Sequence, residues 1–145
     1  MSYRTWHHYG YGLCTTGLKI DSVERIEQLL ACAPEFAKKV HEYLEWNDMS
    51  APTVEDYLEY DDEYRLGIAT ILREVIYEAT GIEFEAVDDF DGKDYLIYTP
   101  TYPWWMPEKD KELTQEKVAA IFVKYVSIVT ETDIVLDYQE IANGG

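Results

Sequence analysis

Basic residues are scarce in this chain. Its 145 residues include 12 Lys and Arg against 29 Asp and Glu, which gives a formal net charge of −17 at pH 7. Such a charge repels the phosphates of nucleic acids and the headgroups of anionic membranes, and it attracts basic protein surfaces. We therefore expect no direct nucleic-acid binding, no membrane binding, and a basic protein as partner.

Cysteines and long apolar runs are also few. Cys14 and Cys32 are too few for a disulfide framework and lack the C-x-x-C spacing of a redox or metal motif. No apolar run approaches the roughly 20 residues that cross a bilayer, and the N-terminal residues lack the apolar core of a signal peptide. We expect a cytoplasmic protein that folds as a single α+β domain over residues 1–145.

Strands are predicted near both ends and in the middle of the chain. Residues 3–13 are rich in Tyr and Trp and would place alternate side chains on opposite faces of a strand. Gly10 and Gly12 then lie on one face and suggest a bulge or very close packing. Residues 82–90 and 95–99 flank an Asp-Gly turn and predict a hairpin. Residues 134–141 predict a last strand, followed by a frayed end at Asn143 and Gly144.

Helices are predicted from caps and three-four apolar spacing. Asp21 or Ser22 caps the first, Pro34 opens the second, and Thr53 with Asp56 opens a short third. The clearest helix spans about 61–80, with acids in its first turn and Gly81 at its end. Thr114 caps a last helix. The expected inward positions of the 61–80 helix are Ile68, Leu72, Val75 and Ile76.

The order strand, helices, strand, strand, helix, strand matches the split βαβ, ferredoxin-like arrangement. We expect a single, mainly antiparallel four-stranded sheet with helices on one face. The first crossover is enlarged by a helical insertion over about residues 21–80.

Acidic residues concentrate in that insertion. Between His41 and Tyr64 there are nine carboxylates and no Lys or Arg. A solvated helix face usually intersperses basic residues, so their absence favours a surface for a basic partner or an imitation of the nucleic-acid backbone. Solvated surface acids remain the alternative. The residues expected to bind the partner are Glu55, Asp56, Glu59, Asp61 and Asp62.

Metal and catalytic motifs are weak. The run Asp88-Asp89-Phe90-Asp91-Gly92 has Val87 where a calcium loop needs its first acid, so it favours a turn over a metal site. His7 and His8 are neighbours on a strand and point to opposite faces. No acid–His–nucleophile spacing is present. We expect no metal, no cofactor and no enzymatic activity.

Aromatic residues are abundant, with 13 Tyr and 4 Trp. Tyr102, Trp104 and Trp105 lie on a backbone stiffened by prolines, which lowers the entropy lost on docking. These three are also expected to bind a partner. The alternative is that the segment folds back as a lid on the sheet.

Three stretches carry a resemblance: MSYRTWHHYGYG at 1–12, DDFDGKDYLIYTPTYPWW at 88–105 and DYQEIANGG at 137–145. Together they resemble small acidic proteins encoded by phages and prophages of Gram-positive gut bacteria. The resemblance covers both ends and the hairpin, but not the acidic helical segment. That group has no established activity, so the resemblance transfers no site residues and implies only an accessory phage gene.

In that setting, the leading hypothesis is an acidic inhibitor of a host defence protein, such as a nuclease or a CRISPR effector. Such proteins expose basic nucleic-acid channels that carboxylates can occupy by charge mimicry. The alternative is a binding protein, or sponge, for a nucleotide second messenger. It would stack nucleobases on aromatic rings and hold phosphate with a basic side chain. The candidate residues are Arg4, Trp6, His8 and Trp104.

Overall fold

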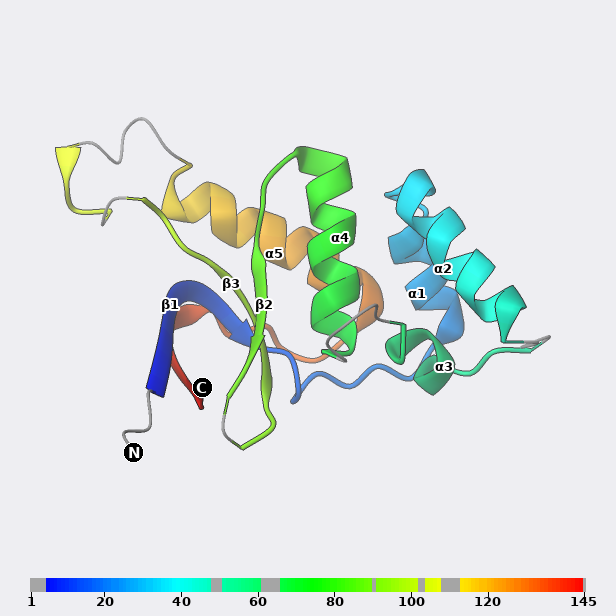
Figure 1. The fold of residues 1–145 in the computed structure, drawn as a ribbon. Coiled ribbons are helices and arrows are strands. Elements are labelled where there is room, and N and C mark those ends of the chain that lie inside the picture. Colours follow the sequence, from blue (N-terminus) through cyan, green and yellow to red (C-terminus); the bar gives the residue numbers. More distant parts are fainter. Residues whose placement is uncertain are drawn as a thin grey trace.

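In the part of the chain that the structure describes, the fold combines five helices with one antiparallel sheet (Figure 1). The computed structural model describes residues 5–47, 51–60, 66–89, 91–101, 104–107 and 113–144, with side chains described for all of these except 5–8, 143 and 144. The elements in chain order are β1 (Thr5–Cys14), α1 (Val23–Leu30), α2 (Pro34–Trp46), α3 (Val54–Leu58), α4 (Ile68–Thr80), β2 (Glu85–Asp88), β3 (Asp94–Tyr98), α5 (Gln115–Val129) and β4 (Asp137–Gly144).

The four strands form one sheet in the order β2-β3-β1-β4, and all neighbours are antiparallel. The predicted α+β class and the single antiparallel sheet are confirmed. β1 lies in the interior of the sheet. Its pairing with β4 runs from Thr5 opposite Gly144 to Gly12 opposite Asp137, so the first and last strands of the chain are direct neighbours.

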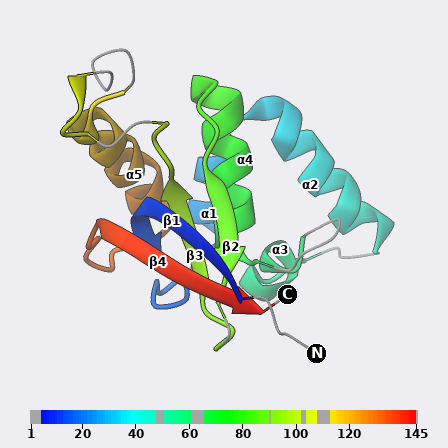
Figure 2. The same ribbon diagram turned by 60° about the vertical axis from the view of Figure 1, so that its left-hand side comes forward.

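The main core lies between the sheet and the helices, which Figure 2 shows behind the sheet. Phe122 of α5 packs on Phe84, with ring centroids 4.8 Å apart, and on Tyr11 of β1 at 6.5 Å. Helix α4 contacts β2 and β3. Its four expected inward residues are buried, as the three-four spacing predicted: Ile68, Leu72, Val75 and Ile76.

The sheet face away from the helices is also partly closed. Ile97 and Ile141 are 0% and 1% exposed. Leu96 belongs to the helix-side core, so Ile97, the next residue on the strand, lies on the opposite face. The two edge strands, β2 and β4, contact each other although they are not hydrogen-bonded neighbours. The sheet therefore curls around this second apolar cluster.

Close packing at the two glycines of β1 is confirmed. A Cβ on Gly12 would lie 2.0 Å from the Leu96 carbonyl oxygen, and one on Gly10 would lie 2.9 Å from the Ile97 side chain. Only glycine lets β1 approach β3 this closely as the sheet curls.

Helix ends follow the predicted caps with one exception. Ser22 caps α1, Thr53 and Asp56 form a capping box on α3, Thr114 caps α5, and Gly81 ends α4 with φ 76°. The prediction for the start of α4 was wrong. The helix begins at Ile68 with no acid in its first turn, because Gly67 has φ 58° and cannot continue a right-handed helix.

Two strand boundaries also differ from the sequence prediction. β2 covers only four residues, Glu85–Asp88, instead of beginning at Ile82. β4 is displaced toward the C-terminus, and Asn143 and Gly144, expected to fray, pair with Trp6 and Thr5. The length of β1 explains the difference, because its first half offers backbone partners to the end of the chain.

Candidate functional site

Part of the acidic segment predicted from the sequence to bind a partner lies on α2 and α3. Glu55 and Glu59 are exposed on α3 and its C-cap, while Glu42 and Glu45 are exposed on α2. Asp61 and Asp62 lie outside the described residues. Four of the solvent-facing carboxylates that the structure describes on α2, on α3 and at the C-cap of α3 are referred to below as the acidic face: Glu42, Glu45, Glu55 and Glu59.

Asp56 has a structural role that separates it from its neighbours. Its Oδ2 accepts a hydrogen bond from the Thr53 N–H at 2.8 Å, and the Thr53 hydroxyl accepts one from the Asp56 N–H at 3.4 Å. This capping box satisfies backbone donors that the first turn of a helix leaves unpaired. Asp56 is half-buried, so its carboxylate holds α3 in place and offers less to a partner than Glu55 or Glu59.

Trp46 lies beside the acidic face and is an exposed residue that sequence reasoning missed. It is 88% exposed at the C-terminal end of α2, one turn after Glu42 and next to Glu45. The signal was its helical position: Phe36, Val40 and Leu44 define the inward stripe, and 100° per residue places Trp46 outside it. An exposed tryptophan among carboxylates combines an apolar anchor with a charged rim.

An aromatic cluster joins α2 to the segment after α3. Tyr60 packs edge-on against Phe36 at 5.5 Å and against Tyr43 at 5.3 Å between ring centroids. Tyr60 directly follows Glu59, and Tyr43 lies one turn before Trp46. The packing therefore holds the two halves of the acidic face in a fixed relation, which limits the entropy lost when a partner binds.

A hydrogen-bonded contact joins the three helices α1, α2 and α3 beneath the acidic face. Glu27 of α1 accepts hydrogen bonds from the buried Tyr57 hydroxyl of α3 and bonds His41 Nε2 of α2 at 2.8 Å. Burial, together with the Glu27 carboxylate, raises the pKa of the Tyr57 phenol well above its ordinary value. Tyr57 therefore stays protonated and keeps donating to Glu27 throughout the physiological pH range.

The proline-rich aromatic segment contains one buried tryptophan, Trp104, and one exposed tryptophan, Trp105. Trp104 is 7% exposed, donates its Nε1–H to the Leu113 carbonyl at 3.0 Å, and packs edge-on against Tyr11 at 5.5 Å. It also stacks on Tyr98, with centroids 6.3 Å apart. Trp105 is 82% exposed. Tyr102 lies outside the described residues, so Trp105 is the one described member of the predicted trio that presents its ring to solvent.

The acids of the hairpin form a turn. Asp89 Oδ1 accepts from the backbone N–H groups of Asp91 and Lys93, both at 2.9 Å, and its Oδ2 accepts from the Tyr95 hydroxyl at 3.1 Å. The backbone bonds to Lys93 and Asp91 lower the pKa of Asp89, and burial with this Asp89 contact raises that of Tyr95 to about 12.

Among the residues that the structure describes, no group of three His, Cys, Asp or Glu side chains is arranged to hold a metal ion. His7 and His8 lie in β1, and their side chains are outside the described set. Cys14 and Cys32 are free thiols.

Comparison with known proteins gave no match to a family model, to a curated protein sequence or to a solved structure. Within the described part of the chain, no helix has both the length and the apolar character needed to cross a membrane.

Proposed function

We propose that this protein binds a basic surface of another protein through the acidic face and Trp46. The observation that carries the proposal is the position of an 88% exposed tryptophan beside exposed carboxylates on α2. Carboxylates speed the encounter with a basic partner, whereas a buried aromatic anchor slows dissociation. The net charge of −17 extends the same attraction over the whole molecule.

We further propose that the partner is a host defence protein, either a nuclease or a CRISPR effector. Its basic nucleic-acid channel would accept the acidic face in place of phosphates, so that the bound protein excludes DNA or RNA. The phage setting, the host cytoplasm and the inhibitory role without catalysis rest on the sequence resemblance described above and on the charge.

For the fold, we propose the split βαβ, ferredoxin-like arrangement. β3 lies between β1 and β2 and is antiparallel to both, and β4 flanks the other side of β1. α4 and α5 occupy the crossover positions before β2 and before β4. These features support the proposal, and the helices α1 to α3 would then be an insertion in the first crossover.

The alternative of a nucleotide-binding sponge has less support from the described residues. Trp104 stacks on Tyr98 and is buried, so its ring is not open to a base. Arg4 lies outside the described residues, and the side chains of Trp6 and His8 are not described. The acidic field also opposes phosphate.

The test is capture of a partner followed by competition with DNA. The purified protein would be immobilised and exposed to lysates of Gram-positive bacteria that carry nuclease and CRISPR defences. The captured protein would then be purified, and its affinity for a fluorescent DNA duplex measured with and without our protein. We expect mutually exclusive binding that weakens as salt rises, mainly through a slower association rate.

Two variants and a matched control make this test specific. Replacing the four carboxylates of the acidic face by glutamine, or Trp46 by Ala, should each weaken capture about tenfold or more. The control removes equal charge elsewhere, at exposed sites outside the acidic face: Glu24→Gln, Asp91→Asn, Glu116→Gln and Asp133→Asn. Equal loss of binding in the control would show that net charge alone is responsible. A captured partner that binds DNA and our protein simultaneously would refute the mimicry.

A further inference from the structure

The strand β2 is an edge of the sheet: among the described strands it is hydrogen-bonded to β3 alone, and β4 contacts it without pairing. We call the unpaired side of β2 in the described part of the chain its open edge. The direction of the backbone groups in β3 follows from two hydrogen bonds. The Thr15 N–H donates to the Asp94 carbonyl at 2.8 Å, so the polar groups of Asp94 face β1. The Asp89 N–H donates to the Lys93 carbonyl at 3.0 Å, so those of Lys93 face β2.

These directions alternate along a strand. The backbone N–H and C=O groups of Tyr95 and Ile97 therefore also point toward β2. Their partners in register are Val87 and Glu85, whose backbone groups therefore face β3. Ala86 lies between them and points its N–H and C=O toward the open edge. Alternate residues of β2 thus offer their backbone N–H and C=O groups for hydrogen bonds to an incoming strand.

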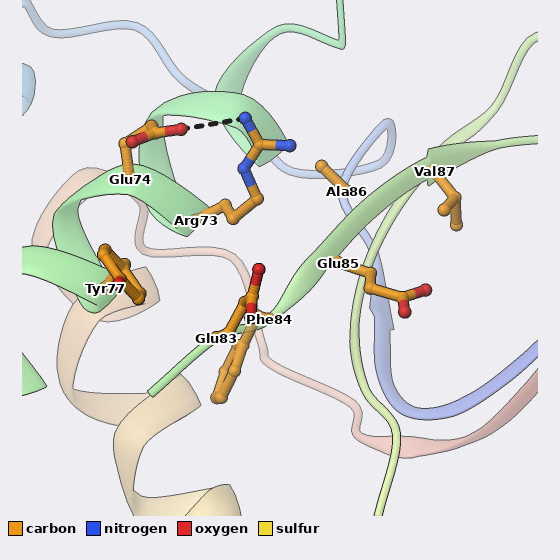
Figure 3. Close-up of a pocket in the computed structure, with 8 residues that line it drawn as sticks. All are labelled: Arg73, Glu74, Tyr77, Glu83, Phe84, Glu85, Ala86 and Val87. Carbon is orange, nitrogen blue, oxygen red and sulfur yellow. Dashed lines mark hydrogen bonds and ion pairs between the residues drawn. The ribbon is translucent and has the colours of Figure 1, made fainter. Parts of the chain in front are cut away.

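A groove of about 590 Å³ runs along this open edge (Figure 3). One wall is α4, with Arg73, Glu74 and Tyr77, and the other is β2 with the residues just before it. Arg73 Nη2 forms an ion pair with Glu74 Oε1 at 2.9 Å. Tyr77 is 54% exposed, so an aromatic ring is available to an occupant.

The two sides of β2 differ in chemistry. Figure 3 shows Ala86 on the side of α4, whereas Glu85 and Val87 point to the other side. A strand added at this edge would place alternate residues against Ala86 and Tyr77, where apolar side chains fit. The residues in between would lie beside Glu85, where Lys or Arg fit, and Glu83 adds a second carboxylate in the stretch just before the strand.

We propose that the edge of β2 is the docking site for an extended segment of a partner protein that alternates basic and apolar residues. The segment would add to the sheet as a further strand and lie in the groove against α4. Charge decides against a second copy of this chain as the occupant, because pairing two β2 edges would bring Glu83 and Glu85 of both copies together. This inference does not depend on the acidic face, which lies on other elements.

The test uses a defined probe, the capped hexapeptide acetyl-Lys-Val-Lys-Val-Lys-Val-amide, which spans about 20 Å when extended. Calorimetry would measure its affinity, and hydrogen exchange would follow the Ala86 amide. We expect binding that slows exchange of this amide, because the peptide carbonyl accepts from it. The hexapeptide acetyl-Glu-Val-Glu-Val-Glu-Val-amide should not bind.

The decisive variant is a charge reversal, Glu83→Lys with Glu85→Lys. It should weaken the basic peptide about tenfold or more and allow the acidic peptide to bind. Its control, Glu24→Lys with Glu116→Lys, changes the net charge equally on α1 and α5 and should leave the preference for the basic peptide intact. Ala86→Pro removes the outward N–H at a position where an edge strand tolerates proline, and should also abolish binding.

The proposal is overturned if the basic peptide does not bind at millimolar concentration, or if it binds without slowing exchange at Ala86. It is also overturned if the reversed variant keeps its preference for the basic peptide. None of these outcomes bears on the acidic face, because Glu83, Glu85 and Ala86 are not part of it.

Discussion

Trp104 and Trp105 are neighbours in sequence, yet they serve opposite purposes. The backbone turns one indole into the core beside Tyr11 and Tyr98 and leaves the other 82% exposed. The sequence offered two interpretations of this segment, a docking surface and a lid. The burial of Trp104 agrees with the lid, whereas the exposed Trp105 is still available for docking.

We predict that Trp104→Ala lowers the free energy of unfolding by about 3–5 kcal/mol, the usual cost of deleting a large buried aromatic side chain. The Leu113 carbonyl also loses its donor. The matched control, Trp105→Ala, should change stability by less than about 0.5 kcal/mol. Urea denaturation followed by circular dichroism gives both values. Similar losses for the two variants would contradict the lid.

Individual residues were predictable where a local rule applied. The spacing of Thr53 and Asp56 predicted the cap that the structure contains, although it also removes Asp56 from the freely exposed acids. Trp46 obeys a rule too, since it departs from the inward stripe of α2. The burial of Trp104 had no such signal, because Tyr11, against which its ring packs, comes from β1, far away in the chain.

At the scale of elements, the β2–β3 hairpin concentrates negative charge. Burial, followed by the charges of Asp88 and Asp89, raises the pKa of Asp94 above its ordinary value. A carboxyl whose folded-state pKa is raised favours folding most when protonated. Its contribution is therefore fully present below the unfolded pKa, about 3.9, and is lost as the pH rises through the folded value.

We predict that Asp94→Asn stabilises the protein at pH 7 by up to about 1 kcal/mol, because it removes the ionised, partly buried carboxylate. The difference from wild type should shrink as the pH falls through the raised pKa, since the native carboxyl then becomes neutral as well. Urea unfolding at several pH values measures this trend. The exposed Asp133→Asn is the control for charge removal. A gain for Asp94→Asn that stays constant down to pH 3 would contradict the electrostatic cause.

Helices were more predictable than strands in this chain. Apolar spacing and caps are local, so α1, α2, α3 and α5 begin where the sequence indicates. α4 is the exception, because the periodic pattern continues across Gly67 while the backbone does not. Strand limits depend on distant partners: β4 reaches Gly144 only because β1 extends back to Thr5. Alternation alone contains no information about that pairing.

At the scale of the whole molecule, self-repulsion accompanies the net charge of −17. Among the described residues the ion pairs are few and lie at the surface, for example Arg25 with Glu131 at 2.7 Å, and such pairs contribute little. Several exposed carboxylates of the described part of the chain, such as Glu24, Glu42 and Glu55, therefore face mainly solvent and ions. Screening should accordingly favour the compact state.

We predict that sodium chloride stabilises the protein against urea. Raising the salt from about 0.01 M to about 1 M shortens the Debye length from about 30 Å to about 3 Å, which screens most repulsion between surface carboxylates. The urea midpoint should rise. The variant with glutamine at the four positions of the acidic face should start more stable and gain less from salt. A midpoint that is independent of salt, or that falls, would show that attractive pairs outweigh the repulsion.

The interior position of β1 has a consequence for synthesis on the ribosome. β1 is translated before the other three described strands, and both of its sheet neighbours, β3 and β4, follow more than 70 residues later. The nascent chain therefore carries a Tyr-rich strand with no sheet partner until β3 emerges, and the helices α1 to α4 are complete before that. Pairings between such distant segments close slowly. β1 can therefore pair with its sheet neighbours only after the helices α1 to α4 have been translated.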